Sequence, residues 1–137
     1  MTTTELIEQG TALYNKGDAE GFCAFYGPGT VLTTPDGSFT GDGILPYVRG
    51  LIAAFPDGEV TIGRHTEDGG TYFGEFTLRG TNTAPIPMPD GSEIPATHRS
   101  IEVTGMEIAV GEGDGITRHD MVWDGMAMLT QLGLAGG

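Results

Sequence analysis

The chain has 137 residues and a formal net charge of −13, with six Lys and Arg against nineteen Asp and Glu. This length predicts one domain over residues 1–137 with its own hydrophobic core. The negative charge repels phosphate backbones and anionic membrane surfaces, which argues against nucleic-acid and membrane binding. Cys23 is the only cysteine, so no internal disulfide can form. The N-terminus lacks a signal-peptide pattern and no apolar run reaches membrane-spanning length, so we expect a soluble, cytoplasmic protein.

Helix and turn signals occupy the first part of the chain. Apolar residues recur at helical spacing after the hydroxyl side chains of residues 2–4, and this repeat ends at Lys16-Gly17. A second short apolar run follows Asp18, and the turn Pro35-Asp36-Gly37 marks a hairpin. The pattern therefore predicts two opening helices, the second over 19–26, then a hairpin over 30–40 and a third helix over 44–55.

From residue 60 onwards, the apolar pattern changes to the period of β-strands. We expect strands over 60–65, 72–82, 98–110 and 115–124, and a closing helix over 125–132. Residues 83–97 contain four prolines, which predicts a long irregular loop of the kind that borders a site. Helices followed by antiparallel strands indicate an α+β fold, in which a curved, mostly antiparallel sheet wraps around the N-terminal helices and forms a cone with an inner pocket.

Several strings of residues resemble one family with this order of elements. They are LRGTNT at 78–83, PATHR at 95–99, GMEI at 105–108, and WD at 123–124 followed by LTQLG at 129–133. Nearly the whole chain is similar to the SnoaL-like polyketide cyclase (ester cyclase) family of the nuclear transport factor 2-like superfold. The resemblance implies cofactor-free intramolecular aldol closure of an aromatic polyketide ester, with a pocket aspartate as acid/base, and favours a homodimer. The chain departs from the family pattern at Asn82, where histidine is common, and at Asp120, where tryptophan is expected.

Asp120 is the leading candidate for a catalytic acid/base. If the last hairpin turns at 111–114, Asp120 lies opposite Gly105 and in the same row as Phe76, on the apolar face that lines the pocket. A carboxyl group there loses hydration, which raises its pKa and suits it to removing a proton from carbon next to a carbonyl. Gly105 would leave room for a flat ligand. A register shifted by one residue turns His119 and Trp123 inward instead.

Other polar residues near this strand each have a structural alternative. His98 borders the proline-rich loop and could donate to a substrate carbonyl or enolate, or it could be an exposed residue at a strand end. Asp124 precedes the closing helix, where it could cap the helix or act as a second carboxylate. Arg118 lies across the hairpin from Glu107 and could form a surface ion pair or contact a ligand. In the favoured register His119 faces solvent.

The remaining candidates lie further from this strand. Tyr14 and Tyr47 are on helices that should face the sheet, as core residues or as ligand contacts. His65, Arg79 and Asn82 are assigned to the rim of the pocket or to the exterior. The three histidines show no HxH or HExxH spacing, so we expect neither a metal site nor a cofactor.

Three functional hypotheses remain, and each expects a small apolar organic ligand. In the first, a polyketide cyclase or isomerase, Asp120 abstracts an α-proton and His98 steadies the enolate. In the second, a cofactor-free epoxide hydrolase, Arg118 with Asp120 and Asp124 positions water and protonates the oxirane. In the third, the chain is a non-catalytic module whose pocket holds a hydrophobic metabolite or whose sheet makes a homodimer.

Overall fold

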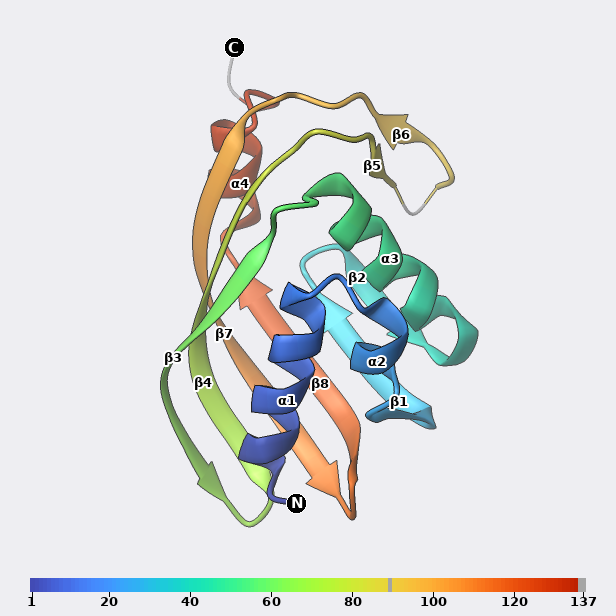
Figure 1. Cartoon of the computed structure of the whole chain (residues 1–137), viewed down its shortest axis with the longest axis vertical. Helices are drawn as coiled ribbons and strands as arrows, with labels where there is room; N and C mark the ends of the chain where they lie inside the picture. The colour runs from blue at the N-terminus through green and yellow to red at the C-terminus, as the bar shows by residue number, and fades with distance from the viewer. Residues whose placement is uncertain (89, 136–137) are drawn as a thin grey trace.

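The computed structural model describes residues 1–88 and 90–135 and contains four α-helices and eight strands in this part of the chain (Figure 1). The helices are α1 (Thr3–Asn15), α2 (Ala19–Cys23), α3 (Ile44–Ala54) and α4 (Gly125–Gln131), with a 3-10 turn, η1 (Gly41–Gly43), before α3. The strands are β1 (Tyr26–Thr34), β2 (Gly37–Thr40), β3 (Glu59–Asp68), β4 (Thr71–Thr81), β5 (Ile86–Pro87), β6 (Glu93–Ile94), β7 (Ser100–Glu112) and β8 (Gly115–Trp123). None of the described helices is long and apolar enough to cross a membrane.

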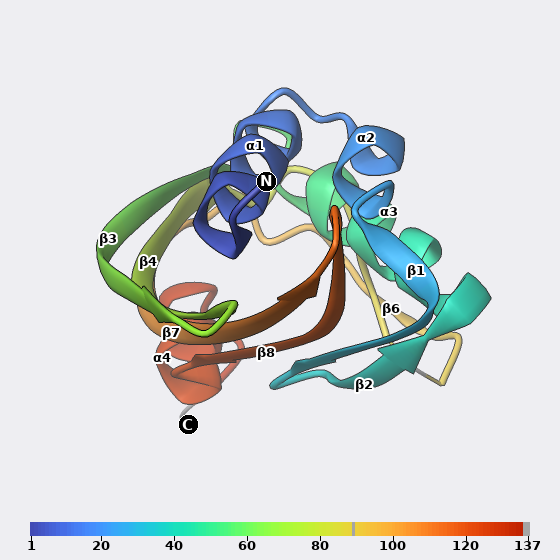
Figure 2. The ribbon, with the colours of Figure 1, turned by 90° about the horizontal axis from the view of Figure 1, so that it is seen from below.

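Six strands form one curved sheet in the order β2-β1-β8-β7-β4-β3. Neighbouring strands are antiparallel except for β1 and β8, which run parallel. Figure 2 shows the sheet bending around α1, with α2 and α3 also on the concave side. This arrangement confirms the predicted α+β fold, in which a curved, mostly antiparallel sheet wraps around the N-terminal helices.

The second helix is shorter than predicted. Asp18 caps its start by accepting a hydrogen bond from the backbone N–H of Gly21. The helix ends at Cys23, because the following backbone pairs with β8: the amide of Ile116 donates to the carbonyl of Phe25 at 2.7 Å. Tyr26 therefore opens β1, and its ring packs against the core on the concave side.

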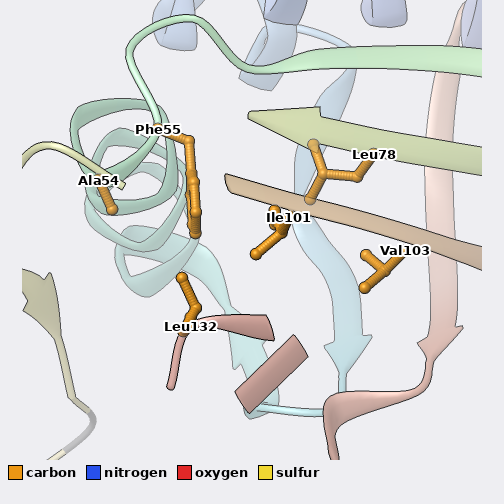
Figure 3. Close-up of a cluster of buried hydrophobic side chains, with 6 residues drawn as sticks. All are labelled: Ala54, Phe55, Leu78, Ile101, Val103 and Leu132. Atoms are coloured by element: carbon orange, nitrogen blue, oxygen red, sulfur yellow. The ribbon is translucent and has the colours of Figure 1, made fainter. Parts of the chain in front are cut away.

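Apolar side chains fill the space between the sheet and the helices. Figure 3 shows the cluster at the α3–α4 end, which consists of Ala54, Phe55, Leu78, Ile101, Val103 and Leu132. A second cluster joins α1 to the sheet and consists of Leu6, Ile7, Tyr72, Ala109 and Ile116. A third packs α2 and α3 against β1 and consists of Ala19, Leu32, Ile44 and Val48. Each large apolar side chain stabilises the fold by about 1.5–3 kcal/mol when fully buried, so these clusters hold the helices on the sheet.

A β-bulge in β8 determines which of its residues face inward. Two residues of β8, Thr117 and Arg118, lie opposite Val110 of β7. The extra residue reverses the alternation of the strand, so that buried Ile116 is followed by two exposed residues and then by buried His119. The residues of β8 beyond the bulge therefore face the opposite way from a regular strand.

The predicted register of the last hairpin is wrong for this reason. Gly105 pairs with Trp123 and not with Asp120, which pairs with Ile108. The other half of the predicted row is confirmed, because Phe76 does pair with Gly105. The bulge and a turn tighter than expected together displace the pairing by an odd number of residues, and an odd displacement exchanges the two faces of a strand.

Asn82 anchors the loop that follows β4. Its side chain is fully buried, so its assignment to the rim or exterior is wrong. The amide nitrogen donates to the carbonyls of Ala54 (3.0 Å) and Ala84 (2.7 Å), and the amide oxygen accepts from the backbone of Thr97 (2.7 Å). The loop, predicted to be irregular, contains the short antiparallel pair β5–β6, and its Pro89 lies outside the described residues.

Candidate functional site

A cavity lies on the concave side of the sheet, between the strands and helices α1, α2 and α3. Its volume, counted as the space open to the centres of water molecules, is about 80 Å³. A single water needs only about 10–15 Å³ on this measure, so the cavity can hold a small organic group. The walls are apolar except for a few residues and carry no Lys or Arg among the described lining residues. The polar lining residues are Thr11, Tyr14, Tyr26, Thr34, Tyr47, Glu107 and His119.

Glu107 and His119 form a buried pair in the wall of this cavity. Glu107 Oε1 lies 2.7 Å from His119 Nε2, and each side chain is 4% exposed. The hydroxyl of Tyr26 lies 2.8 Å from the other ring nitrogen, Nδ1. When Glu107 is ionised, its Oε1 accepts the Nε2–H proton, which leaves Nδ1 as the acceptor for the Tyr26 hydroxyl. The three side chains therefore form one hydrogen-bonded line from β1 through β8 to β7.

Small residues on neighbouring strands make room for this line. Glu107 pairs with Gly74 of β4, and His119 pairs with Ala109 of β7. The ring of Tyr72 covers Gly74, where an added Cβ would come within 2.6 Å of the Tyr72 hydroxyl oxygen. That hydroxyl is buried and has no hydrogen-bond partner among the described residues. Because neither Gly74 nor Ala109 carries a long side chain, the side chains of Glu107 and His119 can lie flat on the sheet beside them.

The tyrosines of the cavity remain protonated at neutral pH. Burial raises the pKa of Tyr26 well above its usual value, and the negative charge of Glu107 adds to this effect. Burial also raises the pKa of Tyr14 to about 12. The Tyr14 hydroxyl has no hydrogen-bond partner within residues 1–88 and 90–135, although it lines the cavity. It is therefore a donor available to a ligand.

Tyr47 belongs to a second polar group in the cavity wall. Its hydroxyl donates to Asp36 Oδ2 at 2.6 Å and lies 2.8 Å from the Thr34 hydroxyl. Burial and the charge of Asp36 raise the pKa of Tyr47 far above its usual value. The ring of Tyr47 is stacked on Phe39, with ring centroids 4.0 Å apart.

Asp120 does not line the cavity, so its predicted inward orientation is wrong. Its carboxylate accepts from the Arg118 guanidinium at 2.8 Å on the outer face of the sheet. Val122, two residues further along the same face of β8, is 67% exposed. His119, predicted to face solvent, points inward with Trp123 instead, as the register shifted by an odd number requires.

The structure also separates the other predicted polar residues from the cavity. Asp124 caps α4, accepting from the backbone of Ala127 at 2.9 Å, which is the structural alternative considered for it. His98 is exposed ahead of β7 in a left-handed conformation (φ 60°), so it is not brought near the buried pair. Arg118 pairs with Asp120 and not with Glu107, because Arg118 and Glu107 lie on opposite faces of the sheet.

The aromatic predictions agree better with the structure. Tyr14, Tyr47, Phe76 and Trp123 all line the cavity, and the last two rings meet edge to face with centroids 6.4 Å apart. Gly105 does not provide the expected space for a flat ligand. The Phe76 ring already occupies it, since an added Cβ at Gly105 would lie 2.6 Å from that ring.

Glu107 and Tyr26 are the site residues that sequence reasoning missed. Glu107 falls on the same alternating face of β7 as Val103 and Ala109, so a lone carboxylate on an apolar face was visible in the sequence. In the predicted register it lay across from Arg118, which offered it an ion pair on the surface. Tyr26 was assigned to the apolar stripe of a helix, and nothing in that pattern distinguished its hydroxyl.

No cluster of three or more His, Cys, Asp or Glu side chains in the described part of the chain could hold a metal ion. The polar groups of the cavity are instead one carboxylate, one imidazole and several hydroxyls. These groups can donate, accept and transfer protons.

Comparison with known proteins places this site in a family. The model of the SnoaL-like domain matches residues 7–119. A search of curated proteins gives no match. Three solved structures show the same fold at low sequence identity. AclR from Streptomyces galilaeus, for which a hydroxylase role has been suggested, is 16% identical, with a TM-score of 0.82 over 98% of this chain and 97% of that chain.

IdmH from Streptomyces antibioticus, for which polyketide cyclisation has been suggested, is 23% identical, with a TM-score of 0.78 over 97% of this chain and 99% of that chain. A protein from Catenulispora acidiphila described as having a ketosteroid isomerase-like fold is 18% identical, with a TM-score of 0.79 over 98% of this chain and 96% of that chain. The family match extends from α1 to His119 and so includes the whole Tyr26–His119–Glu107 line. The chain belongs to the SnoaL-like family.

Proposed function

We propose that this chain is a cofactor-independent acid/base enzyme that removes a proton from carbon next to a carbonyl group. The substrate is apolar, and the reaction is the aldol cyclisation of a polyketide or a related isomerisation. One observation carries the proposal: the Glu107–His119 pair is buried and yet lines an otherwise apolar cavity. Membership of the SnoaL-like family supports it, and so does the polyketide cyclisation suggested for IdmH.

Glu107 is the base in this proposal. His119 holds Oε1, whereas Oε2 makes no hydrogen bond to the described residues and is the oxygen that takes the proton. As the substrate C–H bond breaks, its electron pair forms the carbon–carbon double bond of an enolate, and the carbonyl oxygen takes the negative charge. Tyr26 and His119 fix the position of the carboxylate through their hydrogen bonds.

The Tyr14 hydroxyl is the proposed donor to the enolate oxygen. Its pKa of about 12 keeps the proton in place at neutral pH. In a cyclisation, the enolate carbon attacks a second carbonyl of the same substrate, and the new alkoxide takes the proton back from Glu107. The apolar walls exclude water, which would otherwise protonate the enolate before the ring closes.

The two other hypotheses stand differently. The residues named for epoxide hydrolysis, Arg118, Asp120 and Asp124, do not line the cavity, so no observation favours that reaction. A non-catalytic binding module would use the same apolar walls and is distinguished by experiment. The homodimer and the cytoplasmic location stay predictions.

Exchange of α-protons tests the proposal without knowledge of the natural substrate. The protein is incubated in D2O with a small apolar ketone, and deuterium uptake at the α-carbon is followed by NMR. We expect exchange by the wild type and a loss of about 10²–10⁴-fold in Glu107→Gln, because that substitution removes the base. Asp120→Asn makes the same carboxylate-to-amide change on the outer face and should exchange at the wild-type rate.

Circular dichroism establishes that each variant is folded before the rates are compared. Equal losses in Asp120→Asn and Glu107→Gln would show that the assigned base is wrong. If the wild-type protein binds the ketones in the cavity but never exchanges their α-protons, the enzyme hypothesis is rejected in favour of the non-catalytic binding module.

A further inference from the structure

The second polar group of the cavity lies apart from the buried pair. Its Thr34 is on β1, which β8 separates from the β7 strand that carries Glu107. Leu32 pairs with His119, and Thr34 follows Leu32 by two residues on the same face of β1. Two residues of a strand span roughly 7 Å, so the Thr34 hydroxyl marks a separate region of the cavity. Tyr47 reaches this region from α3, and the exposed Asp36 accepts from its hydroxyl.

Every hydroxyl proton of this group is already used. The Tyr47 proton goes to Asp36 Oδ2 at 2.6 Å, so Thr34 is the donor in its 2.8 Å hydrogen bond to Tyr47. Thr34 Oγ1 also accepts from the backbone N–H of Asp36 at 3.1 Å. The oxygens of Thr34 and Tyr47 each keep one unused lone pair and no free proton. A ligand group can therefore bind here only as a hydrogen-bond donor.

The charges around the cavity select against an anion. No Lys or Arg is present among the described lining residues, whereas Glu107 lines the cavity and Asp36 lies behind Tyr47. The whole chain carries a net charge of −13. An anionic ligand would meet negative charge with no cation to offset it. An ammonium group would lose its hydration among apolar walls, and Asp36 is not among the lining residues that could pair with it.

We propose that Thr34 and Tyr47 form a subsite for a hydroxyl group of a neutral, largely apolar ligand. The ligand hydroxyl donates to the unused lone pair of Tyr47. The stacking of Tyr47 on Phe39 holds the acceptor in place. That this ligand is the substrate rests on the proposed function, and the substrate is then a carbonyl compound that also carries a hydroxyl group away from the reacting α-carbon.

Binding of a matched series tests the subsite in the intact protein. Dissociation constants are measured by calorimetry for naphthalene, 2-naphthol and 2-methoxynaphthalene, of which only the second can donate. We expect the wild type to bind 2-naphthol about tenfold more tightly than the other two, as one additional hydrogen bond allows. In Tyr47→Phe the preference for 2-naphthol should disappear. That variant also frees the Thr34 proton, so the affinity for 2-methoxynaphthalene should rise above the wild-type value.

Tyr72→Phe is the matched control, since it removes the same atom from a tyrosine that does not line the cavity, and it should keep the wild-type preference. A preference that survives in Tyr47→Phe overturns the proposal. So does a preference that is lost in Glu107→Gln instead, because the hydroxyl would then bind the buried pair. Failure of all three ligands to bind overturns it as well. These measurements need no turnover, so their failure leaves the assignment of Glu107 as base intact, and absent α-proton exchange leaves the subsite intact.

Discussion

Breaking the Glu107–His119 pair from one side should cost far more stability than breaking the outer Arg118–Asp120 pair. Each partner of the inner pair is 4% exposed, so solvent screens their interaction little. Glu107→Leu leaves one imidazole N–H without a partner, which costs about 1–3 kcal/mol. His119→Leu leaves a buried carboxylate alone and costs about 3–5 kcal/mol. It also removes the acceptor of the Tyr26 hydroxyl, so it should be the worst single change.

Replacing both partners removes the orphaned groups together, so the double variant should be more stable than the two single losses imply. We expect a coupling free energy of about 2–3 kcal/mol from urea denaturation of the four proteins. The control cycle uses Arg118→Ala and Asp120→Ala, whose side chains are 62% and 28% exposed. That outer pair should couple by less than about 1 kcal/mol. An inner coupling no larger than the outer one would refute the argument that burial makes this pair strong.

Three further predictions concern other buried groups. Burial raises the pKa values of Tyr14 and Tyr72 to about 12, above the usual value of about 10. Their contribution to the free energy of unfolding is therefore complete below pH 10 and is lost as the pH rises toward 12. Urea denaturation measures this loss across the pH range, and tyrosinate absorbance follows the ionisation. Gly105→Ala should destabilise the protein by about 1–3 kcal/mol or more, because its Cβ meets the backbone carbonyl of Val122 and the Phe76 ring. Gly29→Ala, with nothing within 4 Å, should change stability by less than about 0.5 kcal/mol. Asn82→Asp should cost about 3 kcal/mol or more in the same assay, because the carboxylate faces carbonyl oxygens that now lack their donors.

The order of elements was predictable because local signals agree with the final packing. The turn at Pro35-Asp36-Gly37, the helical repeat of 44–55 and the alternation of 72–82 each occur where the structure has the matching element. The prediction failed at residues 24–26, where the same apolar spacing fits a helix or a strand. Pairing of Phe25 with Ile116, about ninety residues away in the chain, decides for the strand, and no local pattern contains that contact.

Part of the site was predictable from the sequence. Whether a residue's position could be predicted depends on whether local or long-range structure orients its side chain. Tyr14 and Tyr47 are oriented by the apolar faces of their own helices, and Phe76 by the alternation of β4, so their inward positions could be derived locally. The orientation of Asp120 and His119 can be predicted only by counting residues through a hairpin. One bulge in that hairpin reverses the result, and both faces of β8 carry large apolar residues that hide it.

Comparing how many charged side chains each orientation of β8 would bury selects the observed register. Alternation along β7 is uninterrupted as far as Val110, so Glu107 faces inward whichever way β8 is turned. The opposite orientation of β8 would add Arg118 and Asp120 to the cavity beside Glu107, and each buried ion costs several kcal/mol even when it is paired. The observed orientation adds only His119, which can enter as a neutral imidazole and still donate to the carboxylate. The bulge at Thr117 thus leaves the Arg118–Asp120 ion pair in water and brings His119 into the cavity beside Glu107, which is the arrangement with the fewest buried charges.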